Sequence, residues 1–307
     1  MTPLRAALYD YLRARRSLGF KLESDGRLLE GFVTFVEQRG ASRITAELAL
    51  DWAKLPTVAR PYRWRERLGV VRSFARYLAT IDPSSEVPSK DLLPAARRRV
   101  APYIYAPAEI EALMASARAL QPPLRAATFE TLIGLLAATG LRLGEALGLD
   151  RVDVDLRGGL LHVRAGLTER REVPLHASTT EALRTYARVR DRRWPNLDTA
   201  AFFVSRLGAR LSKAAVHKTF PQLIHEVGLD GHGHRARPRP HDLRHTFAVS
   251  TLVDWHQAGV DIDRQLPLLS TYLGHRDPNS TFWYLQATPE LLTFVAERLD
   301  GVLGVQP

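Results

Sequence analysis

Residues 241–247 read His241-Asp242-Leu243-Arg244-His245-Thr246-Phe247 and bring two imidazoles and a guanidinium close together in the chain. His241 and His245 are four residues apart, so a helix would place both on one face. Such a pair can bind zinc, but the zinc-protease pattern requires a glutamate directly after the first histidine, and Asp242 stands there instead. The chain has no cysteine and offers no evident third ligand. We therefore expect no metal at this segment.

Three further segments carry residues of compatible chemistry. One is Thr139-Gly-Leu-Arg142-Leu-Gly-Glu145, in which a glycine ends one helix and an arginine begins the next. The others are Leu273-Gly274-His275 and, nine residues later, Tyr284. Each is weak alone, because Arg142 is compatible with an ordinary surface arginine and Tyr284 with core packing.

Taken together, in this order and spacing, the four segments resemble the catalytic signature of the tyrosine recombinases, the phage-integrase and Xer-like family. The combination of His-x-x-Arg-His-Thr, Leu-Gly-His and a tyrosine nine residues later is specific. The resemblance covers nearly the whole chain. It implies a mainly α-helical fold with a small antiparallel β-sheet, in which a helical N-terminal core-binding domain precedes an α+β catalytic domain.

The pattern of residues along the chain predicts two domains joined by a linker. Apolar residues at helical spacing predict a helical domain over residues 1–81. The stretch from Asp82 to Pro107 contains five prolines and Arg97-Arg98-Arg99, which predicts a linker over residues 82–105. Residues 106–307 form the predicted catalytic domain, with short strands at 152–155, 160–163 and 172–175. It ends in a predicted tail helix over 288–303, which can dock on its own chain or on a neighbouring protomer.

The residue types suit phosphoryl chemistry. Attack on a phosphodiester places negative charge on the non-bridging oxygens, so catalysis depends on positioned donors. We expect Arg142 and Arg244 to clamp the phosphate and His241 and His275 to donate to it or move protons. Tyr284 would be the nucleophile. By resemblance, it forms a 3′-phosphotyrosine and releases a 5′-hydroxyl, with no cofactor or metal, while Glu145 supports the clamp.

One position departs from the family pattern. These enzymes usually carry a lysine in the turn between the second and third strands, proposed as the acid for the leaving 5′-oxygen, and alignment places Gly166 there. Neighbouring Arg164, Arg170 and Arg171 are poor acids, because guanidinium does not release its proton in proteins. The proton could come from water or from a group folded close, for which the candidates are His162, Lys213 and Lys218. Otherwise cleavage is slow.

Charge is distributed unevenly along the chain. Of 43 basic and 33 acidic residues, the first 105 positions hold 19 and 11. A cluster opposed only by Glu66 is predicted to contact DNA phosphates, although a solvated helix face would look the same. Its members are Arg63, Arg65, Arg67, Arg72 and Arg76.

These features predict an enzyme whose partner is double-stranded DNA. We expect a site-specific recombinase or integrase of a mobile element, acting as a homo- or hetero-tetramer on two DNA sites in integration, excision or resolution. The alternative is a catalytically weak DNA-binding partner of an active recombinase, for which Gly166 is the main support. A related topoisomerase or telomere resolvase fits the two-domain arrangement less well. The chain lacks a long apolar run and a leader-like start, so we expect a cytoplasmic protein without membrane contact.

Overall fold

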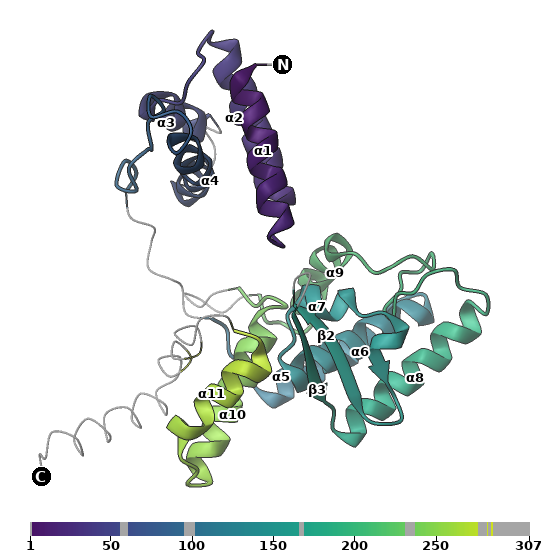
Figure 1. Ribbon diagram of the computed structural model, residues 1–307. Coiled ribbons are helices and arrows are strands. Elements are labelled where there is room, and N and C mark those ends of the chain that lie inside the picture. Colours follow the sequence, from purple (N-terminus) through teal and green to yellow (C-terminus); the bar gives the residue numbers. More distant parts are fainter. Residues whose placement is uncertain are drawn as a thin grey trace, which may run out of the picture. The chain divides into compact units, whose positions relative to one another are not determined.

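A computed structural model describes residues 2–55, 61–94, 102–165, 169–230 and 237–275, together with Thr281 and Tyr284. This part of the chain is mainly helical and contains one small antiparallel sheet, which confirms the predicted fold class. It forms two compact units, residues 1–99 and residues 100–307 (Figure 1). Among the described helices, none is long and apolar enough to span a bilayer.

The described part of the first unit contains four helices around one core. The hydroxyls of Thr2 and Thr45 accept hydrogen bonds from the backbone N–H groups of Arg5 and Leu48, and these bonds cap the first and third helices. Phe32 of the second helix is fully buried in the core. The helices are α1 (Pro3–Ser17), α2 (Glu23–Gln38), α3 (Ala46–Lys54) and α4 (Pro61–Ala79).

The described stretch after α4 lies against that helix. Leu93 is buried in the core of the first unit. The Arg65 Nη1 donates to the Leu93 carbonyl at 3.0 Å, and the Arg72 Nε donates to the Pro88 carbonyl at 2.8 Å. Residues 88–94 are thus held by side chains of α4.

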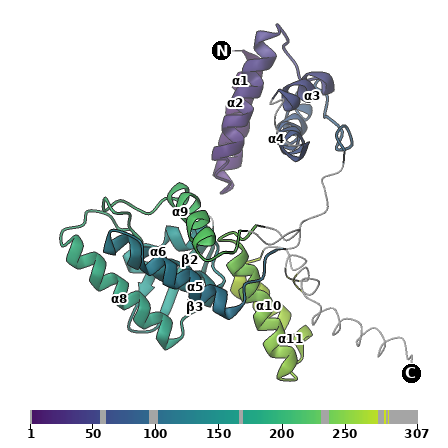
Figure 2. The same ribbon diagram turned by 180° about the vertical axis from the view of Figure 1, so that it is seen from behind.

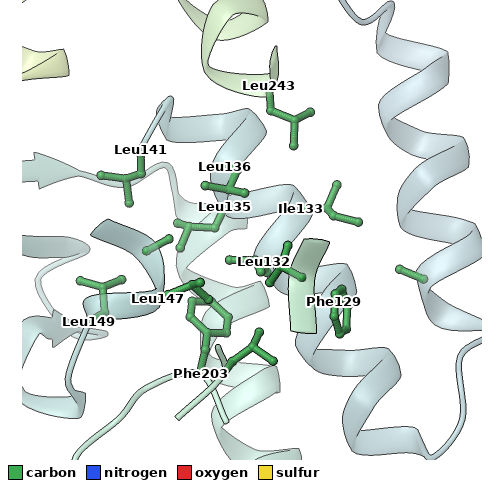
Figure 3. Packing of buried hydrophobic residues seen from close by; sticks show 14 of the residues in the cluster. Phe129, Leu132, Ile133, Leu135, Leu136, Leu141, Leu147, Leu149, Phe203 and Leu243 are labelled. Carbon is green, nitrogen blue, oxygen red and sulfur yellow. The ribbon is translucent and has the colours of Figure 1, made fainter. Parts of the chain in front are cut away.

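The second unit is built around α6 (Pro123–Thr139). Its apolar side chains are spread around the helix axis rather than gathered on one face, and Leu132, Leu135 and Leu136 are buried, as expected for a helix that is covered by others. Figure 3 shows these side chains packed with Phe203 and, from a distant part of the chain, Leu243. The other described helices are α5 (Pro107–Arg118), α7 (Leu143–Gly148), α8 (Ala177–Arg193), α9 (Lys213–Glu226), α10 (Asp242–Gln257) and α11 (Ile262–Leu273).

The sheet has the order β1-β2-β3 and is antiparallel throughout. Its strands are β1 (Val154–Asp155), β2 (Leu160–Ala165) and β3 (Glu169–Pro174). Val163 pairs with Arg171 and Leu161 with Val173. The prediction placed the start of the third strand three residues too late, because it relied on apolar side chains. The polar start of β3 is held by backbone pairing with β2. Val152 also lies outside β1, in a 3₁₀ turn.

Helices α10 and α11 pack together around a second cluster of the same unit (Figure 2). Leu252, Leu269 and Leu273 are buried in this cluster. Tyr284 is 3% exposed and packs in it too. The chain segments that carry the functional residues therefore converge where α10 and α11 meet the end of α6.

Candidate active site

The first functional segment in the chain starts with a tight turn at the end of α6. Gly140 has a φ of +59°, in the left-handed region that favours glycine. A Cβ at this position would lie 2.6 Å from Phe247 Cδ1, which is too close for any side chain without rearrangement. The turn leads into Arg142, the residue that precedes α7.

Arg244 lies in α10 and is 2% exposed. Its Nη1 donates to the Gly140 carbonyl at 2.8 Å and its Nη2 to the Leu273 carbonyl at 2.7 Å. Burial, followed by repulsion from Arg142, lowers the pKa of Arg244 to about 10, while hydrogen bonding with the Tyr284 hydroxyl favours the charged form. Arg244 is therefore a fixed cation at neutral pH.

Arg142 is held by a neighbouring carboxylate and a distant carbonyl. Its Nη1 donates to Glu145 Oε1 at 2.8 Å, and its backbone N–H donates to Glu145 Oε2 at 2.9 Å. Its Nη2 reaches the Gly274 carbonyl at 2.8 Å. The Arg142 side chain is 39% exposed, so part of the guanidinium faces outward. Glu145 thus binds both the guanidinium and the backbone N–H of Arg142.

Arg171 completes this network, a role that residue types and spacing did not predict. It donates from Nη1 and Nη2 to the two Glu145 oxygens at 3.0 and 2.8 Å. Burial alone would raise the pKa of Glu145, but hydrogen bonds from Arg171 and Arg142 outweigh it and lower that pKa. The signal that could have found Arg171 is its place on the strand face that carries Val173, which is the buried face.

Two histidine rings flank Tyr284. The ring centroid of His245 lies 5.4 Å from that of Tyr284, and the ring of His275 lies 5.9 Å away in a stacked arrangement. His241 contacts His245, with the two ring centroids 4.8 Å apart. The structure thus brings all four sequence segments together. It also adds His245, which the sequence suggested only as half of a metal pair.

The surroundings keep these imidazoles neutral at pH 7. Burial, followed by the positive charge of Arg244, lowers the pKa of His275 to about 4. Burial and the neighbouring His241 lower the pKa of His245 to about 3. Burial, followed by Arg244, also lowers the pKa of His241, although this side chain reaches the surface. Neutral imidazoles can accept a proton from a nucleophile.

A pocket of about 490 Å³ adjoins the exposed side of Arg142. Lys213, at the start of α9, lines it together with Arg142 and His241. The side chain of Lys213 approaches Gly144, where an added Cβ would lie 3.1 Å from Nζ. Lysine and guanidinium groups around one pocket suit a phosphate-bearing ligand.

Among the described residues, no group of three or more histidine and acidic side chains could hold a metal ion. Asp242, which stands where a zinc protease has its glutamate, is fully buried and accepts a hydrogen bond from Arg239 Nη2 at 3.0 Å. Its carboxylate therefore has a structural partner in the same turn.

The five arginines predicted to contact DNA all lie on α4, in the first unit, and they differ in their surroundings. Arg65 and Arg72 donate to backbone carbonyls of residues 88–94. Arg67 lies over the Trp52 ring at 3.6 Å and donates to its carbonyl. Arg63 pairs with Glu66 at the surface, and Arg76 is exposed. The sequence showed the charge of this cluster but not these partners.

Gly166 and the tail helix predicted over residues 288–303 lie outside the described residues. The sequence also suggested His162, Lys213 and Lys218 as proton donors. His162 is on β2 with its Nδ1 3.7 Å from Glu172 Oε1, and Lys218 is exposed on α9. Lys213 is the one that lines the pocket beside Arg142.

The four segments of the predicted tyrosine-recombinase signature therefore lie together in a mainly helical unit that contains a small sheet. The comparisons with known proteins agree. The model of the phage integrase family matches residues 105–290, and the chain belongs to this family of tyrosine-type site-specific recombinases and integrases.

Individual relatives support the assignment. The chain is 42% identical over 307 residues to y4rB of Sinorhizobium fredii, which is named as an integrase/recombinase, and the match covers 98% of both chains. It is 29% identical to the tyrosine recombinase XerC of Chlamydia trachomatis over 74% of this chain and 67% of the relative.

Solved structures share the fold. The Tn1549 transposon integrase in complex with transposon right-end DNA matches with a TM-score of 0.65 at 17% identity, over 97% of this chain and 99% of that one. The λ integrase dimer bound to a core site matches with a TM-score of 0.58 at 18% identity, over 92% and 76%.

Proposed function

We propose that the chain is the recombinase of a mobile genetic element and that it cleaves and rejoins double-stranded DNA through a covalent bond between Tyr284 and a 3′ phosphate. The observation that carries the proposal is the convergence at Tyr284 of Arg244, whose charged form the Tyr284 hydroxyl favours, and of the His245 and His275 rings. The y4rB relative and the fold shared with a transposon integrase support the mobile-element origin.

Each step then has a group to perform it. Arg142 and Arg244 bind the non-bridging oxygens as negative charge develops on the phosphate. A neutral imidazole, that of His245 or His275, takes the hydroxyl proton as the Tyr284 oxygen bonds to phosphorus. The bond from phosphorus to the 5′-oxygen breaks, and that oxygen must gain a proton. Reversal with a different 5′-hydroxyl rejoins the strand, because the phosphotyrosyl bond conserves the energy of the broken one.

Lys213 is the proposed source of the proton for the leaving 5′-oxygen, in place of the usual hairpin lysine. Lys213→Ala should cleave ordinary DNA about 10²-fold more slowly, the lower end of the range for general acids. A substrate with sulfur as the bridging 5′-atom should restore its rate, because a thiolate leaves without a proton. Lys218→Ala is the matched control on the same helix and should cleave both substrates normally. Equal losses on both substrates would assign the proton to another group.

The lowered histidine pKa values predict an unusual pH dependence. Because His275 gains its proton only as the pH falls toward about 4, the base form should persist through pH 5.5 in the free enzyme. We expect single-turnover cleavage at subsaturating enzyme to change little between pH 7.5 and 5.5 and to decline below that. A decline centred at the ordinary histidine pKa of about 6.5 would contradict this arrangement.

The protein also needs partners for complete strand exchange. Two duplexes have four strands to cleave and each chain supplies one Tyr284, so we propose a homo- or hetero-tetramer on two DNA sites. In this scheme the arginines of α4 bind DNA phosphates outside the catalytic unit. The second candidate function is a catalytically weak partner of an active recombinase, which the glycine at position 166 favours.

A library of nicked duplexes with randomised flanks separates the two functions. In such substrates the cleaved fragment diffuses away, so the covalent intermediate accumulates. We expect wild-type protein alone to form a detergent-resistant adduct that enriches one sequence. DNA binding and enrichment without an adduct would contradict the enzyme and support the weak partner.

A further inference from the structure

The guanidinium of Arg171 is largely buried and binds other groups of the protein. The side chain is only 13% exposed, and Glu145 is 8% exposed. The Arg171 Nε donates to the Tyr272 carbonyl at 2.8 Å, while Nη1 and Nη2 donate to the two Glu145 carboxylate oxygens. All three nitrogens of Arg171 therefore donate to protein acceptors, two of them to a carboxylate, and a guanidinium has no proton to give.

Glu145 is shared between two cations. Each of its oxygens accepts one bond from Arg171 and one from Arg142, the latter through Nη1 and the backbone N–H. The three side chains together carry one net positive charge. Without Arg171, the negative charge of Glu145 would be balanced by Arg142 alone. Most of the electrostatic attraction between Arg142 and the DNA phosphate would then be cancelled.

The same side chain fixes the segment before His275. A Cβ at Gly274 would lie 2.8 Å from Arg171 Nη1, and Gly274 has a φ of +68°. The glycine therefore allows Arg171 to pass beneath the turn whose carbonyl binds Arg142 Nη2. This close approach explains why the residue between Leu273 and His275 is a glycine.

We propose that Arg171 is a positioning residue that orients Glu145, and through it the Arg142 guanidinium, and that ties strand β3 to the turn carrying His275. The inference rests on the proposed function for its effect on DNA cleavage. Its structural part, the Arg171–Glu145–Arg142 arrangement, is independent of that function.

Arg171→Gln tests the proposal. Because misplacement of a catalytic group by about 1 Å lowers a rate by about 10²-fold, we expect cleavage to slow by about this factor at saturating DNA. DNA affinity should stay within about threefold, since Arg171 does not face the ligand. The loss should be equal with oxygen or sulfur as the bridging 5′-atom, unlike that of Lys213→Ala. Arg171→Lys keeps the charge but loses the paired donors, so it should recover only part of the rate.

A carboxyl NMR titration of Glu145 gives a readout without any cleavage. In wild-type protein the pKa of Glu145 should lie below its ordinary value, and in Arg171→Gln it should rise. Arg170→Gln, the exposed neighbour on β3, is the matched control and should leave the Glu145 pKa unchanged. If wild-type protein cleaves no DNA, the proposed function fails, while this titration still decides whether Arg171 controls Glu145.

Three results would overturn the proposal. One is a normal cleavage rate in Arg171→Gln, and another is an unchanged Glu145 pKa. The third is recovery of the rate on the sulfur substrate, which would make Arg171 part of the proton path. Should Arg171→Gln fail to fold, Arg171→Lys is judged by its cleavage rates on the oxygen and sulfur substrates.

Discussion

Arg244→Gln should reduce single-turnover DNA cleavage by about 10³ to 10⁵-fold, the range for loss of an arginine that stabilises charge on a transferring phosphate. The side chain is 2% exposed and fixed by the carbonyls of Gly140 and Leu273. Glutamine removes the positive charge and cannot span both carbonyls. A lost donor in a buried site is not replaced by water, so the full electrostatic effect should be seen.

Two companion variants separate charge from geometry. Arg244→Lys retains the charge but lacks the planar fork, so its rate should lie between wild type and Arg244→Gln. Arg264→Gln removes an exposed arginine of α11 in the same unit and should cleave normally. If Arg244→Gln, checked for folding by its melting temperature, cleaves within about threefold of wild type, the assignment of Arg244 to the phosphate is wrong.

Tyr284→Phe should abolish covalent adduct formation altogether. The hydroxyl is the proposed nucleophile, and phenylalanine removes it while keeping the ring in its cluster with α10 and α11. The loss of one hydrogen bond should lower the free energy of unfolding by only about 1 kcal/mol. DNA binding should remain. The measurement is denaturing gel electrophoresis after incubation with nicked substrate.

The control for this variant is Tyr272→Phe. Tyr272 is a partly buried tyrosine of the same unit. Its ring is stacked on Phe247, and its backbone carbonyl accepts a hydrogen bond from Arg171. It should form the adduct at the wild-type rate. Adduct formation by Tyr284→Phe, or its loss in Tyr272→Phe alone, would place the nucleophile elsewhere.

Much of the fold and the site could be predicted from residue types and spacing. Helical periodicity and glycine stops located the helices, and the combined segments indicated Arg142, His241, Arg244, His275 and Tyr284 together. This works because phosphate chemistry requires particular side chains, and these are visible in a sequence. The start of β3 was missed because its pairing is made by the backbone and leaves no apolar pattern.

The contacts that hold the site could not be predicted in the same way. Arg244 and Arg142 are fixed by backbone carbonyls, and every residue has a carbonyl, so sequence gives no sign of which is used. Arg171 looks like a surface arginine until Glu145 is found beside it. The arginines of α4 illustrate the same limit, since Arg65 and Arg72 bind carbonyls of their own unit in a way that net charge does not reveal.

The covalent link between Tyr284 and DNA provides a direct test of the proposed mechanism. Adduct formed by wild-type protein on nicked DNA can be digested with nuclease and trypsin and then analysed by mass spectrometry. The proposed mechanism predicts a nucleotide bound through its 3′ phosphate to Tyr284, within the tryptic peptide of residues 277–298. A nucleotide attached to any other residue, or attached through a 5′ phosphate, would contradict it.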